Sequence, residues 1–182
     1  KYFTDFFVHE AENLKKQAII EAENKKIYDA KYKIVKDQKV AYFETIKKTA
    51  TKTSSGLRYK IITKGTGKKP AQKATVYVHY SGFLEDGELF DSSVAEVANS
   101  FGKLDPQRAQ ARQYLPIPYE VGRKDGMIPG FIEGLEKLSF GDKAVLFIPS
   151  HLAYGAQGAG GVIPPNANII FEVELVESIP QP

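Results

Sequence analysis

The first part of the chain has a helical pattern of apolar and polar positions. Apolar side chains recur in two adjacent seven-residue registers, which together form a stripe along one face of a helix. The stripe consists of Phe6, Phe7, Leu14, Ile20, Ile27, Tyr28, Ile34, Val35, Ala41 and Tyr42. Residues 1–52 contain no glycine and no proline, the residues least favourable inside a helix. The pattern predicts an all-α segment over 1–52, with breaks near Asn24 or Asp37 that divide it into two or three helices.

Two interpretations of this segment are open. It either packs on itself or on the rest of the chain, or it is a dimerisation arm that pairs with a second copy. A full coiled coil is disfavoured, because the second core register that a coiled coil needs is polar. That register holds Glu10, Gln17, Asn24, Lys31 and Gln38.

The pattern changes after a polar linker at 49–55. From residue 56 onward, apolar and polar positions alternate in short runs, which is typical of β-strands. Strands are predicted near 57–62, 75–80, 88–93, 116–121, 142–149 and 167–179, and a short helix near 129–138. All 15 glycines and all 10 prolines fall after residue 52, so composition and pattern change together. The sequence therefore predicts an α+β domain over 53–182, with an antiparallel sheet wrapped over one helix.

Composition and charge exclude several classes of function. The net charge of +3 gives little electrostatic reason to expect a nucleic-acid partner, and no apolar run is long enough for a membrane span. Cysteine is absent, which removes disulfides and thiolate nucleophiles. The three histidines have no metal-ligand spacing, and the glycine-rich 155–161 stretch lacks the ending of a phosphate loop. We expect no metal and no cofactor.

Four separated segments carry the most specific signal. They are VHYSGFLEDGELFDSS (78–93), GMIPGFIEGLEKLSFGDKAVLFIP (126–149), LAYGAQGAGGVIPPNA (152–167) and IIFEVELV (169–176). In order and spacing the chain resembles FKBP-type peptidyl-prolyl cis-trans isomerases over about residues 54–180. The resemblance implies an FKBP-like twisted antiparallel sheet around one short helix, with a shallow apolar pocket between them.

The resemblance also implies which residues form the pocket. The expected catalytic residues are Tyr80, Phe90, Asp91, Phe131, Tyr154 and Phe171. The expected substrate-binding residues are Ile117, Met127, Ile128, Val162 and Ile163. By the same resemblance, the Tyr154 hydroxyl and the Ile128 backbone N–H donate hydrogen bonds to substrate carbonyls. Asp91 lies at the pocket edge. Phe131 forms the floor, where many members carry tryptophan.

These residue types suit the rotation of an X–Pro bond. That rotation is slow because amide resonance has to be broken, at a barrier of about 18–20 kcal/mol. No covalent bond is made or broken, so a catalyst has to bind the twisted amide better than either planar isomer. The twisted amide is less polar than the planar one, and an aromatic-lined pocket therefore favours it.

The chain departs from the smallest family members in one region. The stretch over 94–115 is longer than theirs and lies beside the expected pocket. The arginine that often follows the FDSS motif and pairs with its aspartate has no clear counterpart. Arg108 and Arg112, within the insertion, are the candidates.

The expected function is acceleration of X–Pro rotation in client polypeptides, with macrolide inhibitors as a further class of ligand. The alternative is a chaperone or binding module that has the fold but little catalysis, with clients bound by the helical arm. Members with an N-terminal helical region resemble the infectivity-potentiator type, which are often bacterial and exported. We therefore expect a location in the bacterial periplasm or cell envelope, with the cytoplasm left open.

Overall fold

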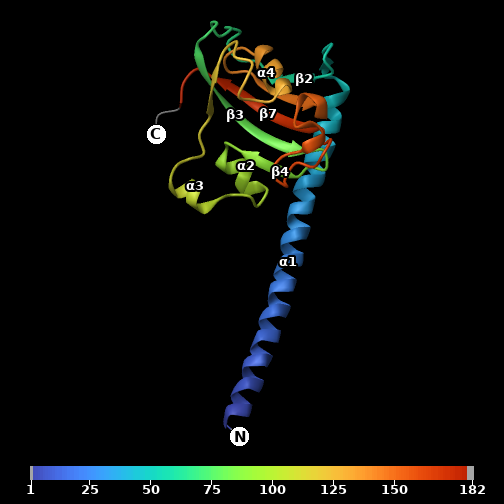
Figure 1. Cartoon of the computed structure of the whole chain (residues 1–182), viewed down its shortest axis with the longest axis vertical. Helices are drawn as coiled ribbons and strands as arrows, with labels where there is room; N and C mark the ends of the chain where they lie inside the picture. Colours follow the sequence, from blue (N-terminus) through green and yellow to red (C-terminus); the bar gives the residue numbers. More distant parts are fainter. Residues whose placement is uncertain (1, 180–182) are drawn as a thin grey trace. The chain divides into compact units, whose positions relative to one another are not determined.

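A long helix precedes a unit built of sheet and short helices (Figure 1). The computed structural model describes residues 2–179, with side chains from residue 7 onward. Two compact units are present, one formed by residues 1–35 and the other by 36–182. In the described part of the chain, no helix is long and apolar enough to cross a membrane.

Helix α1 (Tyr2–Lys48) is continuous. The predicted breaks near Asn24 and Asp37 are therefore wrong. Asparagine and aspartate cost only about 0.7 kcal/mol relative to alanine inside a helix, which the remaining residues of a long segment without glycine or proline can offset. An exposed pair between Lys25 and Asp29, four residues apart, adds a small local contribution.

Seven strands form one antiparallel sheet in the order β1-β2-β6-β7-β3-β4, with β5 paired to β3. Their bounds are β1 Thr51–Lys52, β2 Arg58–Thr63, β3 Thr75–Leu84, β4 Leu89–Ser92, β5 Ile117–Glu120, β6 Lys143–Ile148 and β7 Ile169–Val176. The predicted α+β architecture is confirmed. The prediction of a polar linker over 49–55 is partly wrong, because Thr51 and Lys52 pair with β2 as a short edge strand.

Strand β3 pairs with three other strands and is longer than predicted. It pairs with β7 along most of its length, with β5 through its first half and with β4 through its second. The sequence predicted a strand over 75–80, but β3 continues to Leu84. Glycine is needed here because a Cβ at position 82 would lie 2.4 Å from the Phe90 ring and 2.8 Å from the Phe171 ring. Gly82 thus marks a close approach of side chains, not a turn.

One face of the sheet packs on helix α4 (Pro129–Glu136) and forms the main core. Alternate residues of the central strands supply it, as the period of two requires. The most deeply buried are Leu57, Val76, Val78, Leu138, Leu146, Ile148, Ile169 and Leu175. Pro129 suits the first helical position because its missing N–H would have no partner there.

The opposite face carries an aromatic cluster that includes a residue of α1. The Phe43 ring lies 5.2 Å from that of Phe83 and 6.3 Å from that of Phe147, measured between centroids. Phe101, which follows helix α2 (Ala95–Ser100), lies 5.3 Å from Phe83. Lys39 bonds Glu172 at 3.0 Å over the same cluster. The compact unit that contains the sheet begins at Lys36 and so includes these α1 residues.

His79 lies on this second face, and its burial makes stability sensitive to acid. It pairs across the sheet with Glu174, its Nδ1 lies 3.1 Å from the Ser93 hydroxyl, and Lys143 is also close enough to act on its charge. Burial is the main cause that lowers the pKa of His79 below its ordinary value, while Glu174 raises it and Lys143 lowers it.

Protonation of His79 therefore opposes folding. The pKa of His79 in the folded state lies below its unfolded value of about 6.5. Neutral His79 therefore makes its full contribution to the free energy of unfolding above about pH 6.5, and that contribution is lost as the pH falls through the folded pKa. We expect His79→Gln to reduce the loss of unfolding free energy between pH 7 and pH 5 in urea titrations. His9→Gln, on the exposed part of α1, should leave that loss unchanged; equal effects would contradict the prediction.

Candidate active site

A hollow of about 210 Å³ opens between α4 and one end of the sheet. Its lining comes from β3, β4, β5, β7, α4, the segment before α4 and the loop after β6. The lining residues are Tyr80, Phe90, Asp91, Ile117, Gly126, Met127, Ile128, Phe131, Tyr154 and Phe171. All the residues predicted for the pocket are among them except Val162 and Ile163. Gly126 was missed, although it begins one of the matched segments and its positive φ of +84° requires glycine.

Phe171 forms the centre of the hollow. Its ring contacts those of Phe131, Phe90 and Tyr80 at centroid distances of 4.9, 5.6 and 6.2 Å. All three contacts are edge-to-face, the arrangement that aromatic quadrupoles favour. Phe131 and Phe171 are also buried members of the main core. The floor is therefore rigid, apolar and held by the packing of the whole domain.

Asp91 supplies the polar edge of the hollow. Its Oδ2 accepts a 2.5 Å hydrogen bond from the Tyr80 hydroxyl, and its Oδ1 accepts one of 2.8 Å from the backbone N–H of Ser92. Burial, and next the hydrogen bond to Asp91, raise the pKa of Tyr80 well above its ordinary value. Tyr80 consequently stays protonated and keeps Asp91 in one orientation.

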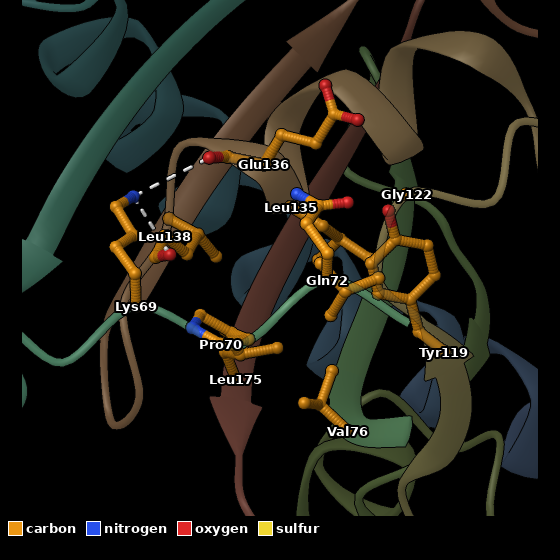
Figure 2. A pocket seen from close by; sticks show the side chains of 11 residues that line it. Lys69, Pro70, Gln72, Val76, Tyr119, Gly122, Leu135, Glu136, Leu138 and Leu175 are labelled. Carbon is orange, nitrogen blue, oxygen red and sulfur yellow. Dashed lines mark hydrogen bonds between the residues drawn. The ribbon is translucent and has the colours of Figure 1, made fainter. Parts of the chain in front are cut away.

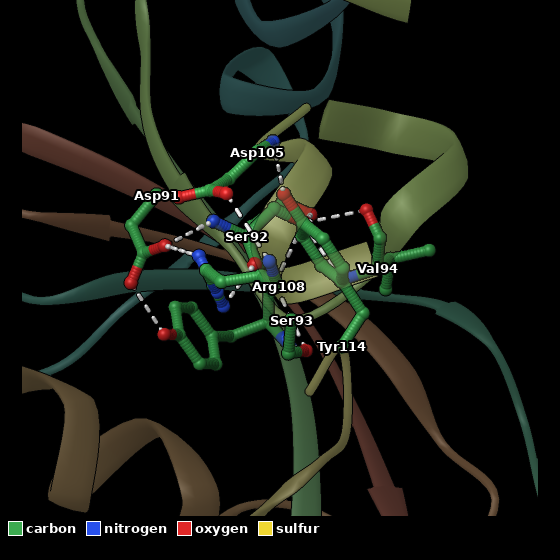
Figure 3. Close-up of polar contacts among 9 residues, drawn as sticks. Asp91, Ser92, Ser93, Val94, Asp105, Arg108 and Tyr114 are labelled. Atoms are coloured by element: carbon green, nitrogen blue, oxygen red, sulfur yellow. Dashed lines mark hydrogen bonds and ion pairs between the residues drawn. The ribbon is translucent and has the colours of Figure 1, made fainter. Parts of the chain in front are cut away.

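The insertion provides the arginine that pairs with Asp91 (Figure 3). Helix α3 (Pro106–Gln110) is capped by the preceding Asp105, whose Oδ1 accepts hydrogen bonds from the backbone N–H groups of Gln107 and Arg108. Arg108 Nη1 then lies 3.3 Å from Asp91 Oδ1. Its guanidinium stacks 4.4 Å from the centroid of the Tyr114 ring. The structure therefore selects Arg108 from the two candidates.

We expect Arg108 to act as a positioning residue. Both partners of the Arg108–Asp91 pair are more than a third exposed, so the pair contributes at most about 1 kcal/mol. Arg108→Ala should therefore lower kcat/KM for an X–Pro peptide by up to about fivefold, and Arg108→Lys should restore part of it. Arg112→Ala is the matched control from the same insertion. Equal losses in the two alanine variants would refute the assignment.

Tyr154, Val162 and Ile163 lie on the loop that follows β6, in different surroundings. Tyr154 lines the hollow and is 39% exposed. Ile163 exchanges backbone hydrogen bonds with Ala159, and its side chain is buried in the main core. Val162 is 53% exposed and, like Ile163, is not among the lining residues.

The site is thus an aromatic hollow with one carboxylate at its edge, on an antiparallel sheet that packs on a helix. The family model for the FKBP-type peptidyl-prolyl cis-trans isomerase matches residues 66–176. The chain belongs to this family, and the resemblance drawn from the sequence is confirmed.

Individual relatives agree with the family match. An FKBP-type 22 kDa peptidyl-prolyl cis-trans isomerase of Escherichia coli is 41% identical over 131 residues, which cover 72% of this chain and 54% of that protein. An FK506-binding protein of Neisseria meningitidis is 41% identical over 67% of this chain and 95% of its own length. The crystal structure of FkpA from Escherichia coli matches with a TM-score of 0.54 and 30% identity, covering 95% of this chain and 70% of that one.

The coverage of the relatives is uneven. The chain spans 39% to 54% of the length of the first bacterial isomerases it matches.

Proposed function

We propose that this protein accelerates cis–trans rotation of X–Pro bonds in client polypeptides. The observation that carries the proposal is the convergence of Phe90, Phe131 and Phe171 around one hollow beside Asp91. A proline ring matches the size and polarity of such a floor. Catalysis then consists of binding the twisted amide more tightly than the planar one.

The proposed roles follow from position. Phe90, Phe131 and Phe171 hold the proline ring, with Tyr80 completing the wall. Ile117 and Met127 contact the apolar flanks of the peptide. The hydroxyl of Tyr154 and the backbone N–H of Ile128 hydrogen-bond substrate carbonyls, and Val162 and Ile163 shape the adjoining loop. We assign the catalytic role to six of the lining residues: Tyr80, Phe90, Asp91, Phe131, Tyr154 and Phe171.

Asp91 acts through polar contacts with the rotating carbonyl region rather than by transferring a proton. Tyr80, which donates the hydrogen bond to Asp91, has a pKa that is raised chiefly by burial, so its hydroxyl stays protonated near neutral pH. Turnover should consequently change little between pH 6 and pH 8.

The test is a protease-coupled assay with a short X–Pro peptide. An active isomerase raises the rate of cis-to-trans conversion in proportion to enzyme concentration. Rates within about a factor of two of the spontaneous conversion, which takes about 10–100 s at 25 °C, would reject the enzyme. Client protection without turnover would favour the alternative, an FKBP-fold chaperone.

The exposed apolar residues of α1 support a second role for its first part. Within residues 7–35, Leu14, Ile20, Ile27 and Ile34 are each more than half exposed. We propose that this arm pairs with a second copy or contacts unfolded clients. Ile20→Lys with Ile27→Lys in the full chain should convert a dimer to a monomer in sedimentation velocity. A monomer before and after substitution would end the dimer proposal, and unchanged protection of an aggregating client would end the client-binding one.

Two further expectations are proposals of the same kind. Macrolide inhibitors should occupy the hollow, although Phe131 offers a smaller platform than tryptophan. The bacterial relatives named as isomerases support a location in the periplasm or cell envelope. Competition of a macrolide with the peptide, and fractionation of cells that express the native gene, test the two points.

A further inference from the structure

A second hollow, of about 410 Å³, shares the elements β3, β5, β7 and α4 with the aromatic one and is also lined by the segment before β3 (Figure 2). On β3 it is lined by Val76, four residues before Tyr80. On β7 it is lined by Leu175, four residues after Phe171, and on α4 by Leu135, one turn after Phe131. It is therefore separate from the proposed active site and larger, and no residue lines both hollows.

The floor of this distal hollow is apolar and rigid. Val76, Leu135, Leu138 and Leu175 are each at least 97% buried in the main core. At the mouth, Gly122 has a φ of +92°, and a Cβ there would lie 2.6 Å from Gln72 Oε1. A glycine at this position therefore leaves room for the Gln72 amide at the rim.

Tyr119 lines the hollow and carries a buried hydroxyl that has no hydrogen-bond partner among the described residues. Its side chain comes from β5, is 6% exposed, and forms one wall (Figure 2). Its hydroxyl is the one buried side-chain oxygen or nitrogen of the described residues that has no hydrogen-bond partner. Buried hydroxyls are almost always paired, because leaving one unpaired costs about 1–3 kcal/mol. The site thus contains a hydrogen-bonding group that nothing else in the described chain uses.

The two charged side chains at the mouth of the hollow, Lys69 and Glu136, already have partners within the chain. Lys69 Nζ donates to the carbonyl oxygens of Lys137 and Leu138 at 2.8 and 3.0 Å, which satisfies the end of α4. Glu136 pairs with Lys124. An ionised ligand would have to give up its hydration without a free counter-charge, which is costly. The uncharged hydroxyl of Tyr119 is then the group that decides what binds.

We propose that the distal hollow binds a neutral, ring-containing small molecule whose carbonyl oxygen accepts a hydrogen bond from Tyr119. The volume and the apolar floor with few polar groups are those of a small-molecule site. The Gln72 amide at the rim suits a second polar group on the same ligand, such as a primary amide.

Benzamide is the probe, titrated into the ¹⁵N-labelled full chain and followed by the shifts of backbone amide signals. Saturable shifts are expected at Val76, Gly122 and Leu138. Tyr119→Phe should weaken that binding about threefold to tenfold, the range for one neutral hydrogen bond. Because the hydroxyl has no partner in the described chain, the variant should melt no lower than the parent.

Binding at the aromatic hollow is separated by its own signals. Shifts at Ile128 and Tyr154 report that site, and Tyr119→Phe should leave their concentration dependence unchanged. Gln72→Trp, at the exposed rim, should block the distal hollow without disturbing the core. Benzoate, with the same ring and a charge, should bind there more weakly than benzamide. No saturable shift at the distal signals, equal affinity in Tyr119→Phe, or equal binding of benzoate would each overturn the proposal.

Discussion

Replacing Asp91 with alanine is expected to lower kcat/KM for an X–Pro peptide at least about tenfold, which corresponds to about 1.4 kcal/mol of transition-state stabilisation. The carboxylate accepts hydrogen bonds from Tyr80 and from the Ser92 backbone and pairs with Arg108. Its removal leaves a half-buried hydroxyl and a guanidinium without their acceptor at the edge of the hollow. The polar contact with the rotating carbonyl is lost at the same time.

The expected loss lies in catalysis and not in folding. Asp91 is more than a third exposed, so the aromatic floor beneath it should stay packed. Circular dichroism and the melting temperature check that the variant folds. Asp29→Ala, which removes an equally ionic but exposed carboxylate from α1, is the matched control and should retain full turnover. Parent-like turnover in a folded Asp91→Ala variant would show that the pocket edge is misassigned.

Phe43→Ala is expected to lower the free energy of unfolding by about 3–5 kcal/mol, the range for deleting a buried aromatic side chain. Phe43 is 3% exposed and its ring packs against Phe83 and Phe147 on the second face of the sheet. The deletion leaves a cavity between α1 and the sheet that rigid strands cannot close. Urea denaturation of the full chain measures the change.

Glu44→Ala is the control for that experiment. It changes the next residue of the same helix, whose side chain is exposed, and should alter the free energy of unfolding by less than about 0.5 kcal/mol. A small change in both variants would mean that residues 36–48 are not part of the folded unit in solution. The predicted boundary at 52/53 would then describe the domain better than the one at Lys36.

Two hollows in one small core also constrain how these experiments are interpreted. Substitutions at Leu135 or Leu175 would affect both packing and the distal site, whereas Tyr119→Phe removes a single unpaired atom. Asp91 and Tyr119 therefore allow the proposed catalysis and the proposed distal binding to fail independently.

The sequence alone was sufficient for the architecture and for most of the residues that line the aromatic hollow. Alternation with a period of two located the strands, since backbone geometry sends successive side chains to opposite faces. The matched segments placed Tyr80, Phe90 and Asp91 on neighbouring strands and Phe131 on the helix beneath them. These assignments depend on the local pattern of apolar residues and on the order of the motifs, and both are visible in the amino-acid sequence.

Which of several equivalent residues contacts a given partner could be seen only in the tertiary structure. Arg108 and Arg112 are equivalent in sequence, and the cap at Asp105 and the stack on Tyr114 direct Arg108 to the carboxylate. Ile163 was predicted to bind substrate; it does not line the hollow, its side chain belongs to the main core, and its backbone exchanges hydrogen bonds with Ala159.

The tertiary structure was also needed to find the packed face of α1 and the distal hollow. The packed face of α1 includes Lys36 and Lys39, whose charges pair with Glu88 and Glu172, so it did not read as apolar in the sequence. The unpaired hydroxyl of Tyr119 likewise has no signature in the sequence. Local periodicity follows from the geometry of the backbone, whereas the choice among equivalent partners depends on contacts between residues far apart in the chain, and only the packed structure brings those together.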